Sequence, residues 1–245
     1  MTGIQDKVVA ITGASRGIGE ATAMMLARRG AKVVLMALSA DELQGVATRI
    51  TGAGGTAAHL VGDVRQRDDL AKLVAMARER FGKLDVLVSN AGIGPISPLD
   101  DLRVDDWDAM VDVNIKGVLY GIAAALPLFR AQGFGHFVNI ASTAGHRVVA
   151  NQAVYAGTKL AVRAISEGMR VEAGDRLRVT VVSPGFVRTT FTDAAPNADV
   201  KAQLVASREK LAIPPEAIAA AIAFAIEQPP EVDVNEIVVR PTAQS

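Results

Sequence analysis

Short runs of apolar, mostly β-branched residues that alternate with longer helical patterns restrict how this chain can fold more than any other feature. Most of the runs are apolar throughout, as expected of strands that helices cover on both faces. The runs lie at 8–11, 33–36, 57–61, 86–88, 137–140, 179–182 and 237–239, and the helical patterns at 17–29, 40–51, 66–81, 106–130, 152–173 and 215–227. Strand then helix, repeated, predicts an α/β fold with a doubly wound parallel sheet between two helix layers. Because no internal repeat or linker is found, residues 1–245 are expected to form a single domain.

The segment 186–214 is the least regular part of the sequence. It follows the predicted strand at 179–182 and contains Pro196 and Asn197. Loops at the ends of strands often carry function and close over bound ligands. We therefore expect this segment to be a mobile cover over a substrate site.

Composition excludes several classes of protein and site. Lys+Arg and Asp+Glu both number 26, so the formal net charge is zero and nucleic acid is not an expected partner. The absence of cysteine excludes disulfides and thiolate chemistry. The three histidines, His59, His136 and His146, lie too far apart to suggest a paired metal motif, so no metal is expected. No long apolar stretch or secretion signal is recognised, which predicts a cytoplasmic location without a membrane partner.

A glycine-rich loop, residues 12–19 with the sequence Thr-Gly-Ala-Ser-Arg-Gly-Ile-Gly, follows the first predicted strand directly. Glycine allows a tight turn and a close approach to a pyrophosphate, and the following helix offers unpaired N–H groups. A glycine triplet alone also suits an ordinary turn. Its position after the first strand of an alternating chain favours a dinucleotide site, and with it a three-layer Rossmann fold.

The spacing of this loop resembles the Thr-Gly-x-x-x-Gly-x-Gly signature of the short-chain dehydrogenase/reductase family, in its single-domain branch. The resemblance covers nearly the whole chain. Asp63-Val64 is similar to the family's adenine-contacting pair, Asn90-Ala91-Gly92 to its Asn-Ala-Gly motif, and residues 183–189 to its Pro-Gly segment, which binds the nicotinamide carboxamide. The resemblance implies NAD(H) or NADP(H) as cofactor. The residues it implies for cofactor binding are Gly13, Ser15, Arg16, Gly17, Ile18, Gly19, Leu38, Ser39, Asp63, Val64, Asn90, Ala91, Gly92, Tyr155, Lys159, Pro184, Gly185, Val187 and Thr189.

A second group of residues suggests catalysis. Tyr155 and Lys159 are spaced i, i+4 and so share one face of a predicted helix. Ser142 follows the strand at 137–140, at the sheet edge where open α/β folds bind ligands. Each residue alone also suits an ordinary helix or loop. Together they resemble the family's Ser…Tyr-x-x-x-Lys set, and Asn114 resembles its fourth member.

The chemistry of hydride transfer requires these residue types. A hydride that reaches a carbonyl carbon leaves negative charge on oxygen, and Tyr155 is expected to supply the proton as acid/base. The Lys159 ammonium is expected to lower the tyrosine pKa from about 10. Ser142 would donate a hydrogen bond to the substrate oxygen, and the resemblance implies that Asn114 links Lys159 to solvent through a water. The sequence thus predicts an oxidoreductase that moves a hydride between a nicotinamide cofactor and a small ketone, aldehyde or secondary alcohol.

The predicted substrate pocket is mostly apolar and has no arginine cluster that would indicate a phosphorylated or carrier-linked substrate. Its expected residues are Ala144, His146, Val149, Gln152, Phe186 and Phe191. A homotetramer is also expected, from the resemblance and because the helical patterns at 106–130 and 152–173 are apolar enough to have a second face to bury.

The position that usually selects the cofactor departs from the family pattern. It lies about twenty residues past the glycine loop, and an acid there holds the free ribose while an arginine holds the 2′-phosphate. This chain has Leu38 and Ser39, and Ser39 also begins a capping box that ends at Glu42. Without an arginine pair, NAD(H) is expected to be usable. Without an acid, it is expected to bind weakly, while Arg16 could still reach a 2′-phosphate.

Three alternatives remain at this point. An epimerase or dehydratase acting on a nucleotide sugar uses the same Tyr/Lys pair, but it would need further C-terminal residues to build a sugar site. A dinucleotide-binding redox sensor without turnover would not need the catalytic set. A flavodoxin-like signalling domain would share only the fold.

Overall fold

The strands predicted from the apolar runs all form, and they pair in parallel into one sheet of order β3-β2-β1-β4-β5-β6-β7 in the computed structural model, which describes residues 3–244. The order changes direction between β1 and β4, which defines the doubly wound topology and places the switch point between these two strands. The strands are β1 Val8–Thr12, β2 Lys32–Ala37, β3 Thr56–Val61, β4 Val86–Ser89, β5 Gly135–Ile140, β6 Leu177–Pro184 and β7 Glu236–Val239.

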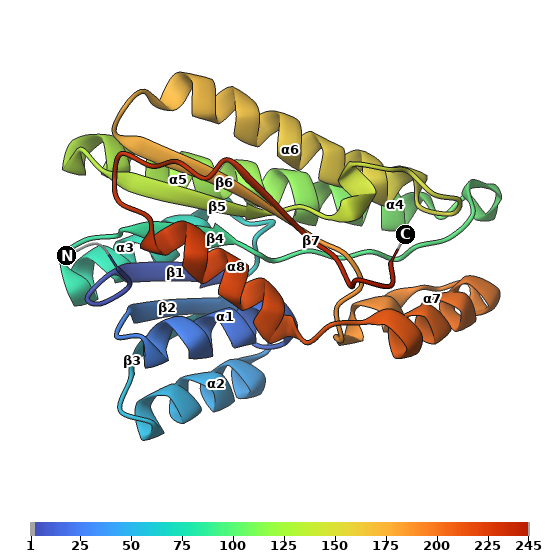
Figure 1. The fold of residues 1–245 in the computed structure, drawn as a ribbon, viewed down its shortest axis with the longest axis horizontal. Helices are drawn as coiled ribbons and strands as arrows, with labels where there is room; N and C mark the ends of the chain where they lie inside the picture. Colours follow the sequence, from blue (N-terminus) through green and yellow to red (C-terminus); the bar gives the residue numbers. More distant parts are fainter. Residues whose placement is uncertain (1–2, 245) are drawn as a thin grey trace.

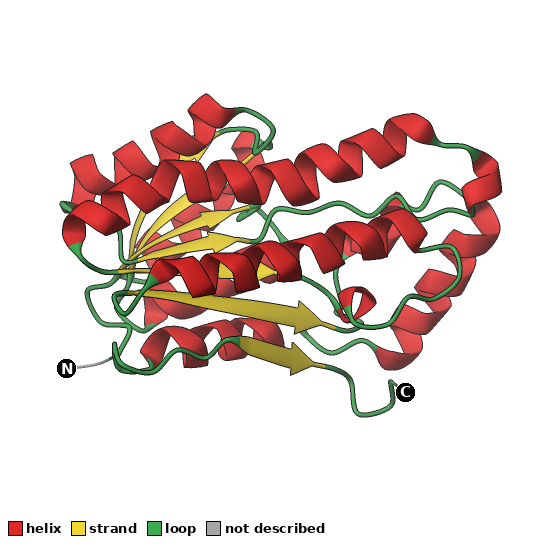
Figure 2. Cartoon of the chain, turned by 90° about the horizontal axis from the view of Figure 1, so that it is seen from above, coloured by secondary structure: helices red, strands yellow, loops and turns green. Residues whose placement is uncertain are grey.

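Helices cover both faces of this sheet (Figures 1 and 2). The α-helices are α1 Gly17–Arg28, α2 Ala40–Gly52, α3 Arg67–Phe81, α4 Val104–Val111, α5 Gly117–Gln132, α6 Ala153–Ala173, α7 Ala198–Leu211 and α8 Pro215–Glu227. Short helical turns are η1 Leu99–Asp101, η2 Asp112–Lys116, η3 Thr143–Gly145 and η4 Thr190–Ala194. The predicted three-layer α/β fold is confirmed.

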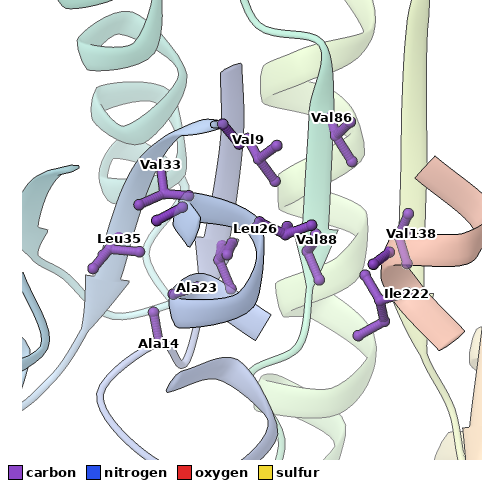
Figure 3. Close-up of a cluster of buried hydrophobic side chains, with 14 of the residues drawn as sticks. Val9, Ala14, Ala23, Leu26, Val33, Leu35, Val86, Val88, Val138 and Ile222 are labelled. Carbon is purple, nitrogen blue, oxygen red and sulfur yellow. The ribbon is translucent and has the colours of Figure 1, made fainter. Parts of the chain in front are cut away.

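Alternate residues of the central strands enter two different cores, because successive side chains of a strand point to opposite faces. Val9 and Val33 belong to one cluster with Leu26 of α1 and Ile222 of α8, and Figure 3 shows Ile222 beside Val138. Their neighbours along the strands join a second cluster with α3 and α5, which includes Phe129. Both faces are therefore buried, which explains why the strand sequences are apolar throughout.

The predicted helix at 106–130 forms within one continuous helical stretch, Val104–Gln132, in which the π-turn η2 lies between α4 and α5. The extra residue in a π-turn shifts the side chains that follow it, and such turns are frequent at functional sites. Asn114 lies in η2 and is buried. Val104–Gln132 as a whole is long and apolar enough to pass for a membrane span, but Ala125 and Phe129 are fully buried in the core of the fold.

The interpretation of 186–214 as irregular is also wrong, because the segment contains η4 and the four-turn helix α7. Asn197 caps α7 by accepting a hydrogen bond from the Val200 amide at 3.2 Å. Charged and apolar residues alternate along α7 with little helical periodicity, so the sequence pattern does not indicate a helix there. Figure 1 shows α7 beyond the strand ends, apart from the helices that flank the sheet.

One buried group, His136 near the start of β5, is sensitive to pH. The imidazole of His136 on β5 is 2% exposed, and its Nε2 shares a hydrogen bond of 2.8 Å with Thr180 Oγ1. Its Nδ1 has no partner within residues 3–244. Burial lowers the pKa of His136 well below its ordinary value of 6.5, and the charges of Arg178 and Lys7 act in the same direction. The fold therefore holds His136 neutral.

We expect the protein to lose stability as the pH falls below about 6.5, because the unfolded chain then binds a proton that the folded chain does not. The expected slope from this one group is about 1.4 kcal/mol per pH unit. Urea unfolding between pH 8 and 5 measures it, and His136→Gln should flatten the curve, whereas His59→Gln should not. Equal slopes for the parent and His136→Gln would contradict this assignment.

Candidate active site

The glycine loop lies between β1 and α1, at the switch point of the sheet. Gly13 and Gly17 have positive φ angles of 62° and 58°, which L side chains rarely adopt. Gly19 has an ordinary φ, but a Cβ there would lie 2.2 Å from the carbonyl oxygen of Gly13. All three glycines of the motif are therefore required by the backbone itself.

Asn90, after β4, holds this loop from the side. Its Nδ2 donates to the carbonyl oxygens of Thr12 at 2.9 Å and Gly13 at 3.1 Å. Thr12 Oγ1 in turn accepts from the amides of Asn90 and Ala91, both at 3.1 Å. The Asn-Ala-Gly motif thus ties the end of β4 to the glycine loop.

A cavity of about 1180 Å³ opens at this edge of the sheet. All the predicted cofactor residues line it except Gly19, which is buried beneath the loop. No side chain caps the first turn of α1 at Arg16, so the amide groups of that turn remain available to an anion. The glycine cradle and the uncapped helix start fit the pyrophosphate of a dinucleotide.

Ser142, Tyr155 and Lys159 meet on the wall of the same cavity, although they come from the η3 turn and from α6. Tyr155 is 8% exposed and packs against Phe191, with ring centroids 5.5 Å apart. Lys159 is 4% exposed, and its Nζ donates to the carbonyl oxygen of Ile140 at 2.9 Å. The same Nζ lies 5.9 Å from the centre of the Tyr155 ring.

Burial dominates the electrostatics of this pair. It raises the pKa of Tyr155 to about 12, against the opposing effect of a hydrogen bond with Ser142, and lowers the pKa of Lys159 to about 8. In the chain without a cofactor the net shift of the Tyr155 pKa is therefore upward, and a lowering of this pKa by the Lys159 ammonium stays a prediction. Desolvation of the buried phenolate is the largest cause of this upward shift, because burial disfavours the charged form.

Asn114 does not line the cavity but braces its floor. Its Oδ1 accepts from the Ile93 amide and its Nδ2 donates to the Ile93 carbonyl, both at 2.9 Å. The Nδ2 also donates to Thr158 Oγ1 at 3.0 Å, which ties the loop after β4 to α6. A Cβ at Gly92 would lie 3.3 Å from both Asn114 Oδ1 and Lys159 Nζ, so these two groups approach the backbone closely. The water-linked role of Asn114 stays a prediction.

The prediction that His146 lines the substrate pocket is wrong. Its Nε2 lies 3.1 Å from both Ser183 Oγ and Glu236 Oε1, and it does not line the cavity. Arg163 donates two hydrogen bonds to the Glu236 carboxylate, at 2.7 and 3.0 Å, and one to the Gly145 carbonyl at 2.8 Å. These residues brace the η3 turn that carries Ser142 against α6 and β7.

The other predicted pocket residues, Ala144, Val149, Gln152, Phe186 and Phe191, do line the cavity. Leu204 and Leu211 of α7, which lie in the segment predicted as a cover, line it as well. Residues that the sequence did not indicate join them from the loop after β4, the loop after η3 and the C-terminus. These are Ile93, Gly94, Ile96, Arg147, Ala243 and Gln244. Gln244 contributes directly, since its Oε1 accepts from the Phe186 amide at 3.0 Å.

Arginines that are scattered in the sequence gather in a second groove of about 900 Å³, beside the glycine loop. Arg49 pairs with Glu20 and Arg208 with Asp193. The groove also contains Glu209 and Glu216, so its charge is nearly balanced. The lining arginines are Arg16, Arg28, Arg49, Arg188 and Arg208.

A doubly wound sheet with a glycine cradle and an uncapped helix at its switch point defines a dinucleotide-binding protein. The family model for short chain dehydrogenase matches residues 7–199. The chain belongs to this family of oxidoreductases.

Relatives match over the full length of the chain. An uncharacterized oxidoreductase of Staphylococcus saprophyticus is 47% identical over 100% of both chains, and one of Listeria monocytogenes is 43% identical over 98% of both. An alcohol dehydrogenase from Thermococcus sibiricus, solved with 5-hydroxy-NADP, has a TM-score of 0.88 at 32% identity, covering 98% of this chain and 99% of that one. A short-chain dehydrogenase/reductase of Burkholderia phymatum, solved with NAD, has a TM-score of 0.89 at 26% identity, covering 97% and 90%.

We expect Gly19→Ala to destabilise the fold by about 1–3 kcal/mol, because the added Cβ meets backbone that cannot rotate away. Gly45→Ala in α2 is the control, since a Cβ there meets only Arg49 Nη1 at 3.7 Å and should stabilise the helix by about 0.5–1 kcal/mol. Urea unfolding compares the two. A Gly19→Ala variant as stable as Gly45→Ala would show that the loop is not constrained in this way.

Proposed function

We propose that this protein is an NAD(P)-dependent alcohol dehydrogenase or carbonyl reductase with Tyr155 as acid/base. Its substrate would be a small ketone or aldehyde, or the corresponding secondary alcohol. The observation that carries the proposal is that Ser142, Tyr155 and Lys159 share one cavity with the glycine loop. A cofactor held by that loop and a carbonyl held by that wall would meet inside the cavity.

The nicotinamide cofactor, when bound, supplies or accepts the hydride. Solved relatives that carry NADP or NAD support this class of cofactor for the chain. The glycine loop and the first turn of α1 would hold the pyrophosphate, and Lys159 would hold the nicotinamide ribose. The segment from Pro184 to Thr189, which lines the same cavity, would hold the carboxamide.

The protonation of Tyr155 suits the reduction of a carbonyl. With a pKa of about 12, its phenol remains protonated at neutral pH and can donate to the substrate oxygen. The Ser142 hydroxyl would donate a second hydrogen bond to that oxygen and share the developing charge. With a pKa of about 8, Lys159 remains mostly protonated at pH 7 and stabilises the phenolate left behind.

The walls of the substrate region favour a small uncharged substrate. Ile96, Val149, Phe191 and Leu204 line it, and the last two come from η4 and α7. We propose η4 and α7 as the cover that moves when substrate enters, in place of an irregular loop. Phe191 of this cover packs against the Tyr155 ring, so the closed cover excludes water from the space in front of Tyr155.

For the cofactor, we propose that NAD(H) is usable. A 2′-phosphate requires charge-assisted hydrogen bonds to offset its desolvation, and Leu38 can supply none. The Ser39 hydroxyl already accepts the amide of Glu42 as the cap of α2. Arg16 remains as a possible contact for the phosphate, since it lines the cavity.

We also propose a homotetramer. Leu160 and Val171 on α6 are 53% and 68% exposed, and Leu119 on α5 is 41% exposed. Phe224 on α8 is 52% exposed, beside the edge strand β7. Two separate apolar surfaces, each closed by a two-fold axis, would give a tetramer with dihedral symmetry.

We expect Tyr155→Phe to reduce turnover by at least about 100-fold, since it removes the proton donor but preserves the packed ring. A panel of small ketones, aldehydes and alcohols, followed at the absorbance of the reduced nicotinamide, identifies a substrate and measures the effect. The dissociation constant of the cofactor should change by only a few fold. Tyr120→Phe is the control, because Tyr120 does not line the cavity. Turnover of Tyr155→Phe within tenfold of the parent would exclude Tyr155 as the acid/base.

We expect Leu38→Arg with Ser39→Arg to shift kcat/KM toward NADPH by about 10- to 100-fold relative to NADH, since each charge-assisted hydrogen bond contributes about 1.5–3 kcal/mol. Ala40→Arg with Gln44→Arg adds the same charge to α2 outside the cavity and should shift the ratio little. A parent that already prefers NADPH a thousandfold would mean that another residue holds the phosphate.

We expect light scattering at micromolar concentration to give four times the chain mass of 25.6 kDa. Phe224→Glu should reduce this mass to that of a dimer, because it buries a charge in the α8 surface. Val61→Glu, on the opposite edge strand β3, is the control and should leave the tetramer intact. A monomeric parent would refute the assembly.

A further inference from the structure

The first turn of α2 contains an acid whose side chain has an unexpected partner. Ser39 Oγ accepts the Glu42 amide at 3.4 Å, which is one half of a capping box. In the other half, the Glu42 carboxylate would return to the Ser39 amide. Instead, Glu42 Oε2 accepts from Ser15 Oγ at 2.9 Å, so that it reaches across to the glycine loop.

This contact lies at the end of the cavity where the cofactor is selected. In doubly wound folds the residue that meets the adenosine ribose follows the second strand, about twenty residues past the glycine loop. Here β2 ends at Ala37, and Leu38, Ser39 and Glu42 all line the cavity beyond it. Asp41, the neighbouring acid of the same turn, does not line it.

Among the residues that the structure describes, the negative charge of Glu42 has no cation paired with it, whereas the charge of the other acid in the cavity is paired with an arginine. Within residues 3–244 the acids that line this cavity are Glu42 and Asp63. Asp63 is held by Arg65, whose Nε and Nη2 donate to Oδ2 at 2.8 and 2.6 Å. The only side-chain hydrogen bond or ion pair of the Glu42 carboxylate within residues 3–244 is the hydrogen bond from the neutral Ser15 hydroxyl. A ligand at this end of the cavity therefore meets a negative charge.

We infer that Glu42, oriented by Ser15, is the specificity-determining residue for the cofactor: its carboxylate accepts hydrogen bonds from the free ribose hydroxyls of NAD(H) and repels the 2′-phosphate of NADP(H). This rests on the proposed function. It corrects the expectation that no acid is present to hold the ribose, because the acid lies one helical turn beyond the strand end. NAD(H) then binds well, although the usual position carries a leucine.

The expected size of the effect is moderate. Glu42 is exposed, and exposed charges interact through a screened, high-dielectric medium. Arg16 lines the same cavity and attracts a phosphate while Glu42 repels it. We therefore expect removal of the Glu42 charge to change each affinity by about three- to tenfold, in opposite directions for the two cofactors.

The test is calorimetric titration of the full chain with NAD⁺ and with NADP⁺, in the absence of substrate. Glu42→Gln removes the charge, keeps an oxygen that accepts from Ser15, and leaves the capping amide of residue 42 in place. Asp41→Asn is the matched control, because it removes the same charge from the same helical turn outside the cavity. Thermal unfolding confirms that both variants fold as the parent does.

We expect Glu42→Gln to strengthen the binding of NADP⁺ and weaken the binding of NAD⁺, so that the ratio of their dissociation constants changes by at least tenfold. Asp41→Asn should change this ratio less than twofold. A ratio within twofold of the parent in Glu42→Gln, or an equal change in Asp41→Asn, overturns the role of Glu42 but leaves the proposed function intact. A parent that binds neither dinucleotide overturns the proposed function and this inference together.

Discussion

The cross-link between the ends of β1 and β4 is the interaction on which the rest of the site depends. At the switch point the two strands diverge into helices on opposite faces, so the edge would open if nothing held it. Asn90 and Thr12 close it with four hydrogen bonds between 2.9 and 3.1 Å. The glycine loop can then keep its positive φ angles and leave the start of α1 uncapped. An uncapped helix start is unfavourable in isolation and is explained by an anionic ligand.

A second set of braces fixes the cavity wall that carries Ser142, Tyr155 and Lys159 relative to this loop. Asn114 ties the loop after β4 to Thr158, and Thr158 Oγ1 donates to the Tyr155 carbonyl at 2.7 Å. On the other side, Arg163 ties α6 to the η3 turn and to β7. The first turns of α6, which carry Tyr155 and Lys159, are thus held on two sides. Buried side chains held in this way keep a fixed geometry, which the proposed catalysis by proximity would require.

The fold could be predicted from the sequence because nearly every element carries a strong local pattern. The strands are continuous apolar runs, and Gly82 and Gly133 adopt the left-handed conformation at the ends of α3 and α5. The pattern failed where structure depends on contacts between distant residues. The π-turn η2 is stabilised by the hydrogen bonds of Asn114, and the helix α7 by the packing of Val200 and Leu204. Sequence periodicity does not reveal such tertiary contacts.

The site was predicted to a similar extent and for the same reason. Motifs placed the glycine loop, Ser142, Tyr155 and Lys159 correctly at one cavity. They did not indicate that His146 turns toward Glu236, or that Glu42 turns toward Ser15, because both depend on a partner far away in the sequence. Nor could they give the pKa of Tyr155, which follows from its burial.

We propose that a bound dinucleotide delivers its hydride to a carbonyl in one fixed orientation beside Tyr155. The most direct measurement uses reduced cofactor deuterated at C4, first on one face of the nicotinamide ring and then on the other, with mass spectrometry of the alcohol product. We expect one deuterium on the carbinol carbon from one labelled face and none from the other. Deuterium transferred from both faces, or absent from the product in both experiments, would contradict the claim.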